Sequence, residues 1–124
     1  MVLNKSISLG EILRKFQAKS PTKASAIVSK EGLLIASIQD TDFNEELIAG
    51  MAAEMLVLGE KTTNEILDAQ PDKIIIETKK GTIILVPAGN EAVFFSVING
   101  KNLGLVLFNM RVAAENTRKI LDGG

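Results

Sequence analysis

Apolar residues recur along the chain with two different periods, and each period predicts one kind of secondary structure. Residues 8–19 carry apolar side chains at three- and four-residue spacing, which is typical of an amphipathic helix. Ser8 stands where it can cap this helix, with Glu11 three residues later in the position of a capping box. Pro21 ends it, because the residue before a proline is disfavoured in helical geometry.

Short runs of apolar and β-branched residues predict five strands in the rest of the chain. Gly32 separates the first two runs, where a hairpin turn favours a positive φ. The last three runs are joined by three or four residues, and connections that short require antiparallel neighbours. The expected strands cover residues 24–29, 33–38, 73–78, 82–87 and 92–98.

Two further segments have helical spacing. The longer one, residues 45–67, follows a polar loop in which Asn44 is the expected cap, and it ends before Pro71. The last one covers residues 103–121; its first residues resemble a strand, but its later apolar spacing indicates a helix. The predicted order is therefore α-β-β-α-β-β-β-α, within one α/β domain that spans residues 1–124.

The later strands are apolar on consecutive residues rather than on alternate ones. Ile74, Ile75 and Ile76 form one such run, and residues 83–86 and 93–95 form two more. Since successive side chains of a strand point to opposite faces, both faces of the sheet must be covered. We expect a three-layer α/β/α sandwich with a five-stranded antiparallel sheet.

The helix over residues 45–67 carries more apolar surface than one layer of packing requires. We expect its larger side chains to pack on its own sheet and its smaller ones to meet another helix closely. The alternative is that the small residues are ordinary exposed helix surface. The larger side chains are Leu47, Ile48, Met51, Met55 and Leu58, and the smaller arc consists of Ala49, Ala52, Ala53, Leu56, Gly59 and Thr63.

The strand over residues 73–78 has little protection against edge pairing beyond its terminal charges. A homodimer that uses this strand and the preceding helix would extend one sheet across two subunits about a two-fold axis. A charge at Ala49 or Ala53 is then expected to shift the protein toward a monomer or an aggregate. The predicted dimer interface consists of Ala49, Ala52, Ala53, Leu56, Gly59, Glu60, Thr63, Lys73, Ile75 and Glu77.

Composition restricts the chemistry. The chain has no Cys and no His, which argues against the usual nucleophiles, bases and transition-metal sites, and we predict no catalytic residue, cofactor or metal. Its 14 basic and 15 acidic residues form no basic patch, so nucleic acid is not an expected partner. Residues 40–44 begin like a calcium loop but lack its glycine and final acid, and residues 59–62 lack the upstream glycine of a P-loop.

The first residues lack the pattern of a secretory signal, and no apolar stretch approaches the roughly 20 residues that span a bilayer. We therefore expect a cytoplasmic protein without direct membrane insertion.

Three local strings and the order of elements together resemble the Roadblock / dynein light chain family, including its bacterial and archaeal gliding-regulator-like members. Residues 26–37 (AIVSKEGLLIAS) are similar to the first hairpin of that family. Residues 49–53 (AGMAA) are similar to its alanine-rich middle helix, and residues 102–106 (NLGLV) to the start of its last helix. The resemblance covers about residues 9–121.

This resemblance implies a five-stranded antiparallel sheet with the middle helix on one face and the terminal helices on the other, an arrangement like that of profilin and longin domains. It also implies dimers joined through the middle helix and the adjacent strand. Members of the family serve small Ras-like GTPases or motor complexes, and the family has no catalytic motif.

Two functions remain open at this point. The leading hypothesis is a non-catalytic homodimeric regulator or scaffold that binds a small Ras-like GTPase, and it leaves open whether the protein stimulates GTP hydrolysis or only binds. The alternative is a structural adaptor that holds a motor or membrane-associated complex together without nucleotide dependence. A ligand-sensing domain is disfavoured, because no polar cluster is available to line a cavity. The expected contacts with the partner are Glu46, Gly50, Glu54, Val57 and Lys61.

Overall fold

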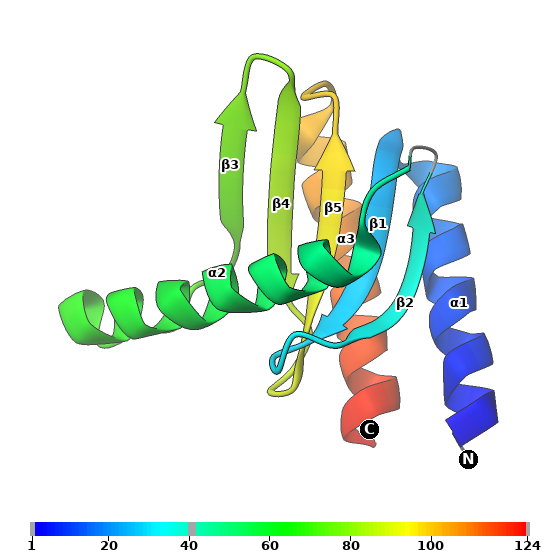
Figure 1. The fold of residues 1–124 in the computed structure, drawn as a ribbon, viewed down its shortest axis with the longest axis horizontal. Coiled ribbons are helices and arrows are strands. Elements are labelled where there is room, and N and C mark those ends of the chain that lie inside the picture. The colour runs from blue at the N-terminus through cyan, green and yellow to red at the C-terminus, as the bar shows by residue number, and fades with distance from the viewer. Residues whose placement is uncertain (1, 40–41, 124) are drawn as a thin grey trace.

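The computed structural model describes residues 2–39 and 42–123, and the side chains of residues 8–39 and 42–123. In this part of the chain the elements follow the predicted order and confirm the α/β/α fold class (Figure 1). They are α1 (Val2–Lys19), β1 (Thr22–Ser29), β2 (Leu34–Gln39), α2 (Glu45–Leu67), β3 (Ile74–Thr78), β4 (Gly81–Pro87), β5 (Ala92–Ile98) and α3 (Leu103–Asp122).

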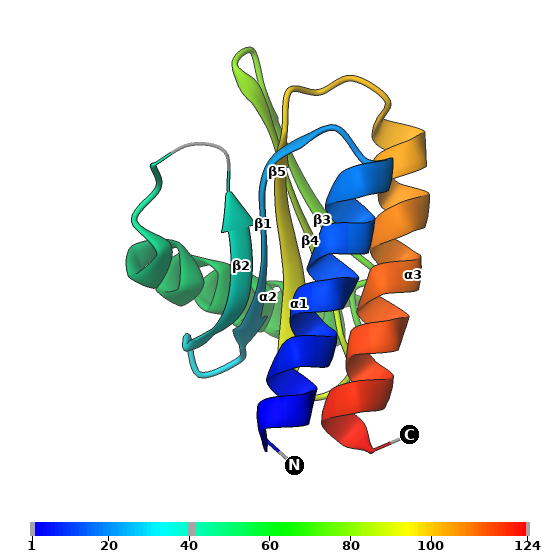
Figure 2. The ribbon, with the colours of Figure 1, turned by 90° about the vertical axis from the view of Figure 1, so that its right-hand side faces the viewer.

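The five strands form one antiparallel sheet with the order β2-β1-β5-β4-β3. The first and last strands of that order, β2 and β3, are its edges. Helix α2 crosses one face, and α1 and α3 lie side by side on the other (Figures 1 and 2). The strand after the long helix, β3, is thus an edge strand.

The core has two parts, one on each face of the sheet. Between the sheet and the pair α1 and α3, the rings of Phe16 and Phe94 meet edge to face with centroids 5.0 Å apart. Met110 of α3 and Leu13 of α1 are fully buried beside them. The other part lies between the sheet and α2 and includes Leu56. A helix layer therefore covers each face, as the consecutive apolar residues predicted.

Several element boundaries differ from the expected ones. Helix α1 begins at Val2 rather than near residue 8, so Ser8 lies within the helix and the predicted capping box is wrong. A capping residue is only a local preference, and no proline or glycine interrupts the residues that precede Ser8. Strand β1 begins two residues early, at Thr22, and β2 lies one residue later than expected.

The predictions around the first hairpin and the long helix are confirmed. Gly32 has a φ of +93°, as the turn between β1 and β2 requires. Helix α2 has the expected bounds, and the side chain of Asn44 caps it by accepting a hydrogen bond of 3.1 Å from the Leu47 N–H. Asp40 and Thr41, in the segment that begins like a calcium loop, lie outside the described residues.

Two serine hydroxyls are buried opposite each other in the middle of the sheet. Ser25 of β1 pairs with Ser96 of β5, and at most 1% of either residue is exposed. Neither Oγ has a hydrogen-bond partner within the described part of the chain. A buried hydroxyl without a partner costs about 1–3 kcal/mol of desolvation.

We therefore expect the substitution Ser96→Ala to raise the free energy of unfolding by about 1 kcal/mol, because it removes this hydroxyl and leaves little space. Urea unfolding at a fixed protein concentration measures the change. The matched control is Ser37→Ala on β2, which removes a hydroxyl that donates to the Glu45 carboxylate and lowers stability. A loss of stability in Ser96→Ala contradicts the prediction.

Candidate functional site

Helix α2 packs on the sheet through its small side chains. Ala49, Ala52, Ala53 and Leu56 are at most 4% exposed and lie against bulky residues of the strands, such as Phe95. The expectation that these four residues of the smaller arc meet another helix is therefore wrong, and their side chains are not available to a second subunit. Of the larger arc, Ile48 and Met55 pack against this core as expected, and the other three side chains do not. The side chains on the facing strands are large, so close packing favours small ones on the helix.

Three of the larger side chains of α2 are exposed instead. Leu47 is 57% exposed, Met51 46% and Leu58 66%. The C-terminal end of α2 extends beyond β3 (Figure 1), and Ile66 and Leu67 there are also exposed. We name Leu47, Met51 and Leu58 the outer arc of α2.

An apolar groove lies beside the outer arc. Figure 1 shows α2 crossing the sheet near the end of β4 and the beginning of β5, so that much of the face has no helix over it. The groove in this region has a volume of about 600 Å³. Its apolar lining consists of Phe43, Ile48, Met51, Met55 and Leu58 on one side and Ile83, Phe95 and Val97 of the sheet on the other.

The edge strand β3 lies at the same side of the molecule as this apolar groove. Within the part of the chain that the structure describes, its backbone pairs only with β4, so its outer hydrogen-bonding groups are open. Ile75 is half-buried and packs into the core under α1 and α3, while Lys73 and Glu77 are exposed. Ile76, on the face of α2, is 38% exposed. A partner would thus meet the backbone of β3 and its exposed side chains rather than Ile75.

The remaining residues of the predicted dimer interface make contacts within the chain. Glu60 forms a salt bridge of 2.9 Å with Lys30 of the hairpin turn. A Cβ at Gly59 would lie 2.8 Å from Cδ1 of Ile74, so this glycine permits close packing of α2 on its own β3. Thr63 is half-buried, and its hydroxyl donates to the Glu60 carbonyl at 3.4 Å. Their part in a dimer stays a prediction.

The residues expected to contact a partner lie along one flank of α2. Glu46, Glu54 and Lys61 are exposed, while Gly50 and Val57 are half-buried. Of these, only Glu54 also lines the apolar groove. Their role is not tested by the structure and stays a prediction.

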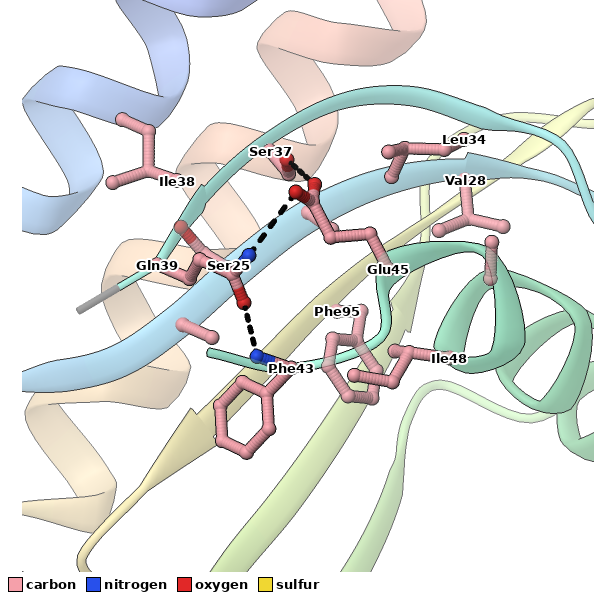
Figure 3. A pocket seen from close by; sticks show the side chains of 13 residues that line it. Ser25, Val28, Leu34, Ser37, Ile38, Gln39, Phe43, Glu45, Ile48 and Phe95 are labelled. Carbon is pink, nitrogen blue, oxygen red and sulfur yellow. Dashed lines mark hydrogen bonds between the residues drawn. The ribbon is translucent and has the colours of Figure 1, made fainter. Parts of the chain in front are cut away.

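The start of α2 is anchored to β2 by a small polar network (Figure 3). The Glu45 carboxylate accepts hydrogen bonds from the Ser37 hydroxyl and, at 3.0 Å, from the Gln39 amide. Oε1 of Gln39 in turn accepts the Phe43 N–H at 3.1 Å. The adjoining cavity is only about 20 Å³, which is room for one water. This network orients the helix and offers no space for a larger ligand.

Charged groups add little reactive chemistry to the described residues. Besides Lys30–Glu60, one salt bridge is present there, between Arg118 and Glu115 on α3. Hydrogen bonds from Arg118 lower the pKa of the Glu115 carboxyl and raise the pKa of Arg118.

In the same part of the chain, no three acidic residues converge as metal ligands would. None of its helices combines the length and apolar character that crossing a membrane requires.

These features define an α/β/α protein whose most conspicuous surface is an apolar helix face beside an open strand. The profile of the Roadblock/LC7 domain matches residues 9–99. The chain belongs to the Roadblock/LC7 domain family, which confirms the resemblance noted in the sequence.

Similar proteins come from archaea and bacteria. Two uncharacterised proteins of Methanocaldococcus jannaschii are 31% and 30% identical over 111 residues, and each match covers 89% of this chain and at least 93% of the relative. The gliding protein MglB from Thermus thermophilus has a TM-score of 0.89 at 14% identity, covering 97% of this chain and 93% of that one. Myxococcus xanthus MglB has the same TM-score at 18% identity, covering 95% and 90%. At these identities the MglB structures show the fold alone.

The two arcs of α2 are distinguished by placing one charge on each. Ala53→Glu buries a carboxylate without a partner and is expected to destabilise the fold by about 3 kcal/mol or more. Leu58→Glu adds the same charge to the outer arc and is expected to fold. Circular dichroism and thermal melting measure both variants, and a parent-like melt of Ala53→Glu would contradict the observed packing of α2.

Proposed function

We propose that the protein is a non-catalytic homodimeric regulator or scaffold that binds a small Ras-like GTPase. The observation that carries this proposal is the outer arc of α2, which leaves three large apolar side chains exposed beside an apolar groove and an open edge strand. A contiguous apolar surface of this kind is typical of an interaction site rather than of a monomer's free surface.

A second copy of the chain is the proposed cover for this surface. In a two-fold arrangement, the outer arcs would pack together while the two β3 strands pair, so that one sheet continues through both subunits. Apolar burial and backbone hydrogen bonds would then act at one interface. A structure titled "MglB with tetrameric arrangement", with a TM-score of 0.90 to this chain, supports self-association as a use of the fold.

The GTPase partner is proposed from the family, whose members serve small Ras-like GTPases or motor complexes. The exposed flank of α2 that carries Glu46, Glu54 and Lys61 would contact it. Arg14 lies on α1, and Arg111 and Arg118 lie on α3; both helices belong to the layer opposite α2. The proposal therefore assigns no arginine of this chain to the GTPase's active site; the dimer would act by holding the GTPase in position.

Charges on the outer arc are expected to dissociate the dimer. The double substitution Met51→Glu and Leu58→Glu would place four carboxylates in one two-fold interface. There they would lose their hydration and repel one another. Sedimentation velocity should then show a folded monomer. Val112→Glu on α3 is the matched control, since it also charges a half-exposed apolar residue but leaves α2 unchanged. A dimer that survives the double substitution excludes this interface.

The proposed function is tested by the nucleotide dependence of binding. Small GTPases of the same genome are loaded with GDP or with a GTP analogue and titrated against the full chain by calorimetry. A regulator that distinguishes the two states should bind one of them about tenfold more tightly. Equal affinity for both states favours the alternative function, a structural adaptor without nucleotide dependence. Absence of binding to every GTPase removes the GTPase from the proposal.

A further inference from the structure

A second apolar groove lies in the opposite layer, between α1 and α3. The two helices run antiparallel and side by side along the sheet (Figure 2). The groove between them has a volume of about 450 Å³. Ile12 and Phe16 of α1 and Ala113 of α3 contribute apolar side chains to its lining, and they are buried or half-buried.

The wall that α3 contributes to this groove carries exposed apolar side chains beside the polar Asn109 and Asn116. Phe108 is 63% exposed and Val112 48%, and both line the groove. Leu105, one turn before Phe108, is 51% exposed. Positions 105, 108 and 112 follow the i, i+3, i+7 spacing with which one helix packs along another. An interface formed by α2 and β3 would leave this stripe uncovered, because it belongs to the other layer.

The groove carries an excess of positive charge. Lys15 and Lys19 of α1 and Lys119 of α3 line it, against a single acidic residue, Glu11. Within the described residues, none of these four takes part in a salt bridge. The neighbouring Glu115 is already bound by Arg118 at 2.8 Å. The groove therefore combines an apolar floor with lysines that have no opposite charge bound to them.

We propose that the α1–α3 groove binds an amphipathic helix with acidic flanks from a partner protein. From Phe108 to Ile120 the groove follows α3 for roughly 18 Å, which is about three turns of a partner helix. The apolar face of that helix would cover Phe108 and Val112, and its acidic flanks would meet the lysines.

A second copy of the chain is the less suitable occupant. Packing two of these grooves together about a two-fold axis would bring lysine-rich rims against lysine-rich rims, and such like-charge contacts oppose association. The proposed occupant is therefore complementary in charge. The proposal is independent of the GTPase, because it concerns the layer opposite α2.

Two designed peptides test the chemistry of the occupant. Both are about 18 residues long, roughly 27 Å as helices, and carry leucines at i, i+3, i+4 and i+7 on one face. One has glutamates on both flanks of this face and the other has lysines. Fluorescence anisotropy with the full chain should show that the glutamate peptide binds about tenfold more tightly, with a preference that weakens as salt increases.

Substitutions in the groove locate the binding. Phe108→Ala combined with Val112→Ala should weaken binding of the glutamate peptide about tenfold, since the apolar contact is lost. Lys15→Glu combined with Lys119→Glu should reverse the preference between the two peptides. The control combines Met51→Ala with Leu58→Ala on α2 and should leave peptide binding unchanged. All the substituted side chains are exposed, and thermal melting confirms that each variant folds.

The proposal is overturned if neither peptide binds, if both bind equally, or if the α2 control weakens binding as much as the groove variant. It is also overturned if the groove variant alone lowers the mass of the unliganded protein in sedimentation, because a second copy then occupies the groove. Failure of the α2 interface or of GTPase binding would leave these readouts intact, so the two proposals fail separately.

Discussion

The packing of α2 on the sheet is the interaction on which the surface of this protein depends. Ala49, Ala52 and Ala53 bring the helix close to the strands, and bulky side chains such as Phe95 fill the space between them. Because the small arc faces inward, the outer arc with Leu58 must face outward. The same contact that stabilises the subunit therefore also leaves an apolar surface exposed.

The two faces of the sheet are covered unequally. Two antiparallel helices cover one face along the strands, whereas on the other a single helix crosses near one end of β4 and β5 (Figures 1 and 2). Part of the second face is therefore left as an apolar groove beside an edge strand that is open to pairing. This groove and this open edge are the surfaces on which the proposed homodimer rests.

The layer formed by α1 and α3 adds a surface of different chemistry. Its groove places lysines around an apolar floor, while the outer arc of α2 is apolar and is flanked by glutamates as well as Lys61. Two grooves with different charge on opposite layers would let the proposed dimer hold different partners at once. Each groove can be altered by exposed substitutions that leave the core unchanged.

The amino-acid sequence by itself determined the order of the elements, the antiparallel sheet and the ends of α2, because periodicity, glycine turns and the Asn44 cap are local properties of the chain. It was less reliable at the start of α1, where Ser8 resembles a cap but lies inside the helix.

Tertiary structure alone decided which arc of α2 faces inward. Both arcs are apolar, so the hydrophobic pattern cannot rank them; the choice depends on the volume of side chains such as Phe95 that the strands present from distant parts of the chain. The groove between α1 and α3 was likewise undetectable in the sequence, since its lysines and its apolar stripe come from the two ends of the chain and meet only when the helices pack side by side.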